Sequence, residues 1–166
     1  PEYFEDSFEV HEDFELKSPG SIGWQYFDGD AGETGAFNFS QDGSKPWPNA
    51  FEAMAYIIMN AGKVSDGNEG TLASDYITLA PRSGEKSLQS WPAAGKKEDD
   101  WLITPHLHFQ EPISFRFYAL NFSNDAPEEI EVLYTTSEIP DVEEFIRIDS
   151  CTINSTYGSW VLKQYD

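Results

Sequence analysis

The sequence predicts an all-β protein built as an antiparallel β-sandwich. Apolar and polar residues alternate over short segments, Gly, Pro and Asp turns recur between these segments, and no long amphipathic helical pattern is present. A chain of 166 residues with 15% aromatic content can bury one sizeable core. Because neither an internal repeat nor a linker divides it, we expect residues 1–166 to form a single domain.

The expected strands of the first half are short and rich in aromatic residues. They are residues 3–10, 23–27, 56–59, 75–80 and 84–91. The first alternates imperfectly and predicts an edge strand with one inward acid, Asp6. The continuous apolar run at 56–59 predicts a strand buried on both faces. Between these strands we expect an Asp/Gly turn at 28–33 and long polar loops at 35–49 and 61–75.

In the second half the alternation is clearer. The predicted strands are a strand that begins at Leu102, then residues 113–117, 130–135 and 160–165. The strands at 113–117 and 130–135 either pair with each other or are joined across sheets, because residues 121–129 are too many for a two-residue turn. Residues 141–145 predict one helical turn after Pro140.

Charge excludes one class of partner. The chain has 30 acidic and 10 basic residues, a formal charge of −20, whereas nucleic-acid binding needs clustered Lys and Arg. Three of the acids, Glu98, Asp99 and Asp100, are consecutive and directly precede a strand. Adjacent carboxylates either spread into solvent or share a cation, so both solubility and multivalent-cation binding stay open.

The turn after residue 27 has a similar composition. Asp28, Asp30 and Glu33 alternate with glycines, as at the start of a calcium loop. An EF-hand loop would need Glu at its twelfth position, and this position is Phe39, so the EF-hand interpretation fails. Calcium in another geometry and an ordinary Asp/Gly turn both remain.

The cysteine and two of the histidines are interpreted as structural or surface residues. Cys151 is the only cysteine, so no intrachain disulfide forms and a free thiol is expected. His106 and His108 alternate on one strand face, but with no other Cys or His nearby we interpret them as surface residues rather than zinc ligands. The sequence holds no apolar run of membrane-spanning length, and because it begins without Met we expect a processed or trimmed segment.

The tryptophans suggest an alternative function, carbohydrate binding. Trp47 lies between two prolines, where an indole can either stack on a sugar or cap the core. Trp24, Trp47 and Trp91 are the candidate ligand-binding residues on this hypothesis. Carboxylate pairs such as Asp28 and Asp99 allow a third hypothesis, a glycoside hydrolase, although no His- or Ser-centred motif accompanies them.

Several motifs in order resemble one family. The octet at 98–105, EDDWLITP, closely resembles the DDWLISP/DNWLITP signature of the cleaved-adhesin and choice-of-anchor J domains of Bacteroidetes surface proteins, relatives of the gingipain adhesin domains. SFE at 7–9, GW at 23–24 with DGD at 28–30, SGEKSL at 83–88 and EVLYTTS at 131–137 resemble further family motifs in the expected order. The resemblance covers nearly the whole chain.

This resemblance implies a jelly-roll β-sandwich, similar also to MAM domains, with structural calcium. The implied metal ligands are Glu9, Asp28, Asp30, Asp99 and Asp100, with Glu5, Asp6 and Glu98 as nearby substitutes. The family continues past its tryptophan strand into at least one further strand, so we expect this segment to lack C-terminal strand(s) of the domain. The loop at 35–49 departs from the family, so its ligand specificity does not transfer.

The function implied is that of a non-catalytic adhesion or binding module. It would be extracellular or at the cell surface of a bacterium, stabilised by calcium, and would bind a host or matrix protein or a glycan. No enzyme activity, nucleic-acid partner or transmembrane segment is expected.

Overall fold

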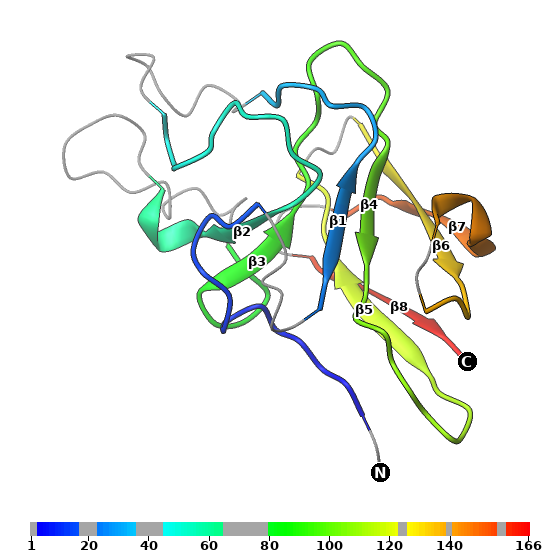
Figure 1. The fold of residues 1–166 in the computed structure, drawn as a ribbon. Coiled ribbons are helices and arrows are strands. Elements are labelled where there is room, and N and C mark those ends of the chain that lie inside the picture. The colour runs from blue at the N-terminus through cyan, green and yellow to red at the C-terminus, as the bar shows by residue number, and fades with distance from the viewer. Residues whose placement is uncertain are drawn as a thin grey trace. The chain divides into compact units, whose positions relative to one another are not determined.

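The computed structural model describes residues 3–16, 23–35, 45–64, 80–122, 126–138, 141–155 and 159–166. The chain divides into two compact units, Pro1–Leu107 and His108–Asp166, called here the N-terminal and C-terminal units. Every strand in the described ranges belongs to a two-stranded antiparallel sheet (Figure 1). The predicted all-β, antiparallel class is therefore confirmed, whereas the jelly-roll order and the single domain stay predictions.

Two antiparallel pairs form the N-terminal unit. Strand β1, Gln25–Asp28, pairs with β4, Asp100–Ile103, and β2, Ile57–Asn60, pairs with β3, Lys86–Gln89. Their positions agree with the strands predicted at 23–27, 56–59 and 84–91 and after the acidic octet. The predicted strand at 75–80 lies outside the described residues except for its last position.

The core of the N-terminal unit surrounds β2. All four of its residues are buried, as expected for the apolar run at 56–59. Close by in the same unit, the rings of Trp47 and Trp91 lie 5.0 Å apart at 44°, an edge-tilted arrangement that aromatic pairs favour. Fully burying an aliphatic side chain of the size of Ile57 or Ile58 stabilises a fold by roughly 1.5–3 kcal/mol.

The C-terminal unit contains two further antiparallel pairs. Strand β5, Phe115–Ala119, pairs with β8, Val161–Tyr165, and β6, Glu128–Tyr134, pairs with β7, Ile146–Ile153. The strands predicted at 113–117 and 130–135 therefore do not pair with each other. They lie in different sheets, as the alternative prediction had it. Strand β6 instead pairs with β7, the next strand along the chain.

The helical turn expected after Pro140 is present. The 3₁₀ helix η4, Val142–Glu144, is capped by the side chain of Asp141, which accepts a hydrogen bond of 3.3 Å from the amide of Glu143. A second 3₁₀ helix, η1, spans Ala61–Lys63. Among the described residues no helix is long and apolar enough to cross a membrane.

The edge strand predicted at residues 3–10 does not form. Phe8 has φ 64°, a left-handed conformation that ends an extended segment, and its amide donates to Asp6 Oδ1 at 2.7 Å. Oδ2 of Asp6 accepts from His11 Nε2 at 3.0 Å and from Trp24 Nε1 at 2.7 Å. The inward acid therefore folds the segment into a turn, because its carboxylate bonds locally instead of leaving the backbone extended.

Candidate metal centre

Strand register places two carboxylates opposite each other. Asp28 ends β1, Asp100 begins β4, and the two are direct partners in the antiparallel ladder. Like charges in this position repel. Asp30, two residues beyond β1, adds a third carboxylate: one ligand oxygen from each of Asp28, Asp30 and Asp100 lies within 4.8 Å of the others. We call these three residues the acidic cluster.

The loop after β1 holds the acidic cluster through short local hydrogen bonds. The amide of Ala31 donates to Asp28 Oδ1 at 2.6 Å, and the amide of Gly32 donates to Asp30 Oδ1 at 2.7 Å. The second of these bonds is an Asx turn, in which an Asp side chain accepts from the backbone two residues further on. The loop bends sharply enough that Ala31 has φ 49°. One oxygen of Asp28 and one of Asp30 are thus used to shape the loop, and the second oxygen of Asp30 accepts from the amide of Asp99 at 3.3 Å.

Two glycines let neighbouring segments approach the acidic cluster closely. A Cβ at Gly29 would lie 2.3 Å from Asp99 Oδ2, and a Cβ at Gly32 would lie 2.4 Å from the Cβ of Ala93. Because real Cβ atoms do not come so close to other heavy atoms, both positions need glycine. The amide of Gly29 also donates to the carbonyl oxygen of Asp99 at 2.8 Å, which joins the loop to the segment before β4.

Within the acidic cluster, Asp100 has a carboxyl group with a raised pKa. Burial is the main cause that raises its pKa to about 7; the charges of Glu98, Asp30 and Asp28 act in the same direction, and the hydrogen bond from the Ser90 hydroxyl opposes them. That hydroxyl donates to Asp100 Oδ2 at 2.9 Å. The other oxygen, Oδ1, is buried and accepts no hydrogen bond in the structure. A buried carboxylate oxygen with no donor is the environment that a cation would complete.

The residues present therefore fit a hard divalent cation. Asp28, Asp30 and Asp100 would hold it, and its positive charge would offset the repulsion among them. Calcium takes six to eight oxygens, so main-chain carbonyls or water would have to complete the shell around these three carboxylates.

The carboxylates of the other two expected ligands make different contacts. Asp99 is adjacent, but its Oδ1 accepts from Trp101 Nε1 at 2.9 Å and its Oδ2 faces Gly29. Glu9 contacts the start of β3, where its Oε1 accepts from the amides of Glu85 at 3.1 Å and Lys86 at 3.0 Å. The structure thus brings together three of the five predicted ligands.

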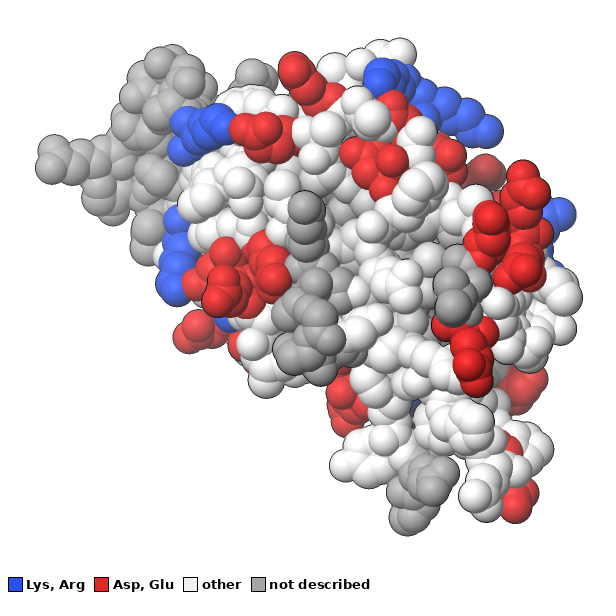
Figure 2. Space-filling view, in the orientation of Figure 1, with Lys and Arg blue, Asp and Glu red and all other residues white. Residues whose placement is uncertain are grey.

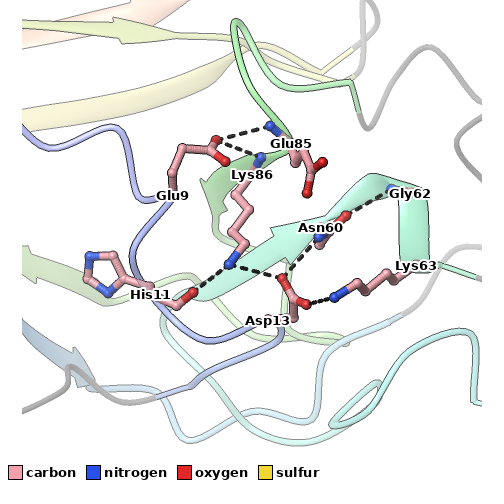
Figure 3. A network of polar contacts seen from close by, with 8 residues as sticks. All are labelled: Glu9, His11, Asp13, Asn60, Gly62, Lys63, Glu85 and Lys86. Atoms are coloured by element: carbon pink, nitrogen blue, oxygen red, sulfur yellow. Dashed lines mark hydrogen bonds and ion pairs between the residues drawn. The ribbon is translucent and has the colours of Figure 1, made fainter.

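Glu9 belongs to a second group of polar residues in the N-terminal unit (Figure 3). In this group Asp13 accepts from Asn60 Nδ2 at 3.0 Å, lies 3.1 Å from Lys86 Nζ, and pairs with Lys63. Burial opposes the charged form of Asp13, but these donors outweigh burial and lower its pKa to about 2. We call Glu9, Asp13, Lys63 and Lys86 the lysine-paired cluster. On the face drawn in Figure 2, some acidic side chains lie beside basic ones and others lie apart from them.

The three candidate sugar-stacking residues are buried. Trp24, Trp47 and Trp91 are 8%, 3% and 2% exposed. A sugar needs an open aromatic face, so these indoles act as core residues in this structure. The alternative position for Trp47, as a cap on the core, agrees with its contact with Trp91.

Two residues that the sequence analysis did not single out contact the acidic cluster. Ser90 is the hydroxyl donor to Asp100, and Lys96 Nζ donates to the main-chain oxygens of Asp30 and Ala31. Lys96 could have been noticed, because with Lys97 it forms the basic pair directly before the three consecutive acids. Nothing in the sequence marks Ser90, which is brought to Asp100 by the path between β3 and β4.

Comparison of the chain with models of protein families, with curated proteins and with solved structures finds no match. The resemblance to the cleaved-adhesin and choice-of-anchor J domains accordingly stays a prediction that rests on the motifs alone.

Proposed function

We propose that this chain is a non-catalytic binding or adhesion module of a bacterial surface or secreted protein, and that its acidic cluster holds a structural calcium ion. Its partner would be a host or matrix protein or a glycan. The convergence of Asp28, Asp30 and Asp100 is the observation that supports this proposal most directly.

The position of the acidic cluster supports a structural rather than a catalytic role for the ion. The cluster lies where the loop after β1 meets the start of β4, so bound calcium would link two segments about 70 residues apart in sequence. A metal that binds only the folded protein stabilises it by mass action. The adhesion role itself is supported by the family resemblance alone.

Thermal unfolding with calcium and with excess chelator tests the metal. We expect calcium to raise the Tm of the wild type and to leave the Tm of Asp100→Asn nearly unchanged. The matched control is Glu129→Gln, which removes one exposed carboxylate from β6 and should keep the full calcium response. Equal Tm values in calcium and chelator, together with no bound metal by elemental analysis, would remove calcium from the proposal.

Binding is tested separately with the purified chain on a glycan array and on immobilised extracellular-matrix proteins. Saturable binding to one ligand class supports a binding module and identifies that class. The absence of binding in the presence of calcium counts against the adhesion role without affecting the metal assignment.

One observation favours a second candidate, a glycoside hydrolase. Asp100, with its pKa raised to about 7, lies beside Asp28, and acid and nucleophile pairs in such enzymes have carboxylates of this kind in close proximity. Hydrolysis of chromogenic glycosides by the wild type, and its loss in Asp100→Asn and Asp28→Asn, would favour the enzyme. We place the structural ion first because three carboxylates, rather than two, share one point.

A further inference from the structure

We infer that Lys96 is a built-in counter-cation of the acidic cluster, and that it competes with a metal ion for the loop that the cluster belongs to. This inference rests on the proposed metal site. Lys96 Nζ donates to the carbonyl oxygen of Asp30 at 2.5 Å and to that of Ala31 at 3.1 Å. One ammonium group thus bridges two consecutive main-chain oxygens of the loop after β1.

The side chain of Lys96 is positioned by the loop itself. Its Cδ would lie 3.2 Å from a Cβ at Gly32, so the aliphatic part passes directly over this glycine. The absence of a side chain at Gly32 leaves the room in which the ammonium reaches the carbonyls. Because Asp30 supplies both a carboxylate of the cluster and one of these carbonyls, the charge of Lys96 is held at a residue that belongs to the cluster.

The oxygens that Lys96 occupies are of the type that a calcium site needs. Three carboxylates supply only part of the six to eight oxygens that calcium takes, and main-chain carbonyls commonly supply others. The carbonyls of Asp30 and Ala31 belong to the loop that bears two of the three carboxylates. A lysine bonded to them therefore opposes metal binding in two ways, by its charge and by occupying potential ligands.

The same contact helps the protein to fold without an ion. Asp28 and Asp100 face each other in the ladder and repel, and the ammonium offsets part of that repulsion while it satisfies the loop carbonyls. Removal of the charge should therefore weaken the metal-free protein and strengthen its binding of calcium. A lysine with only a solubilising role would produce neither effect.

The experiment compares Lys96→Met with Lys97→Met, the same charge change at the adjacent exposed lysine. Calcium affinity is measured by calorimetry and by competition with terbium luminescence, and Tm is measured in chelator. We expect Lys96→Met to bind calcium roughly three- to tenfold more tightly than the wild type, since one nearby charge is lost and two carbonyls are released. It should also unfold at a lower temperature in chelator, whereas Lys97→Met should stay within about twofold of the wild type in affinity.

Each outcome decides between the inference and the proposed function. Equal affinities of the two variants, with calcium bound by the wild type, would overturn the role of Lys96 and leave the metal site in place. Calcium binding by Lys96→Met alone supports the counter-cation and overturns a resident calcium in the natural chain. Absence of binding in all three proteins overturns both. Lys96→Gln, which keeps a donor for the carbonyls but no charge, provides the same comparison if Lys96→Met does not fold.

Discussion

The N-terminal unit contains two groups of acids that differ in how their charge is balanced. In the lysine-paired cluster, Asp13 lies between Lys63 and Lys86, and Glu9 accepts two backbone amides (Figure 3). In the acidic cluster, Asp28 and Asp100 face each other and one oxygen of Asp100 is buried without a donor. The first group has a carboxyl pKa lowered to about 2, and the second has one raised to about 7.

The difference teaches that acid content alone does not indicate a metal site. Both groups come from stretches dense in Asp and Glu, and the resemblance assigned Glu9 to the same ion as Asp28. The donors that surround each carboxylate decide its role: Glu9 and Asp13 already have protein partners, whereas Asp100 still has an unused oxygen. Substitutions in the two groups should therefore change stability in opposite directions.

The largest effect is expected from Asp13→Asn. This substitution removes the ion-pair partner of Lys86, whose side chain is 13% exposed, and leaves a largely buried ammonium with its bond to the carbonyl oxygen of His11 but without the carboxylate of Asp13. Loss of a partner in this setting costs about 2 kcal/mol, while the exposed Lys63 adds little. Urea unfolding measures the change, and Glu131→Gln, which breaks an exposed pair with Arg147, serves as the control. A loss no greater than that of the control would contradict the pairing.

The opposite sign is expected for Asp100→Asn in chelator. Replacing this carboxylate removes the repulsion across the β1–β4 ladder, so the metal-free protein should gain about 1 kcal/mol. In calcium the gain should shrink or reverse, because the wild type then has the ion to offset the repulsion. Destabilisation in chelator comparable to that of Asp13→Asn would show that both clusters are balanced alike.

The two groups should also titrate in separate windows. Asp13 has a folded pKa of about 2, below its ordinary 3.8. Its contribution to the stability of the fold is therefore fully present above about pH 4 and is lost as pH falls through 2.

Asp100 has a folded pKa of about 7, so the folded protein binds more protons than the unfolded chain between about pH 4 and 7. Stability of the metal-free protein should therefore fall as pH rises through that window, by about 1 kcal/mol from this group. Difference curves against Asp13→Asn and Asp100→Asn measure each contribution, and a flat curve between pH 4 and 7 would contradict the second.

The smallest effect is expected from Ala31→Gly. Ala31 adopts φ 49° in the loop of the acidic cluster, and glycine adopts such a conformation without steric cost. We expect a gain of at most about 1 kcal/mol, reduced by the extra freedom of glycine in the unfolded chain. Alanine at Gly84, which has φ 69° beside Glu9 in the lysine-paired cluster, should instead destabilise. Chemical denaturation of both variants gives the comparison, and a loss in Ala31→Gly would show that the loop does not carry this strain.

Much of the strand content could be predicted because the patterns are local. The apolar run at 56–59 and the alternation at 113–117 required no knowledge of partners. Strand β7 was missed, because Ile146 and Ile148 are exposed while Cys151 and Ile153 are buried, so its apolar pattern changes face along its length. Pairing of β6 with β7 depends on a register with a bulge at Val132/Leu133, which local pattern does not specify.

The candidate site was predicted only in part for a similar reason. Asp28, Asp30 and Asp100 are acids at the ends of strands, and strand ends can be located from sequence. The hydrogen bonds of Glu9 and the burial of Trp91 depend on segments that are distant in sequence. Glu9 bonds Lys86, and Trp91 packs against Trp47. Burial of the tryptophans follows from tertiary packing that no single segment encodes.

The attachment of the N-terminal segment has a consequence for folding and aggregation. The bond from Lys86 to Glu9 joins positions 77 apart, and closure of so long a loop is slow relative to pairing of nearby strands. Until the segment docks, β2 lacks the two backbone hydrogen bonds that Ile58 exchanges with Phe14 and Glu15. A nascent or truncated chain would then present an apolar strand with an open edge, the feature through which β-proteins associate into aggregates.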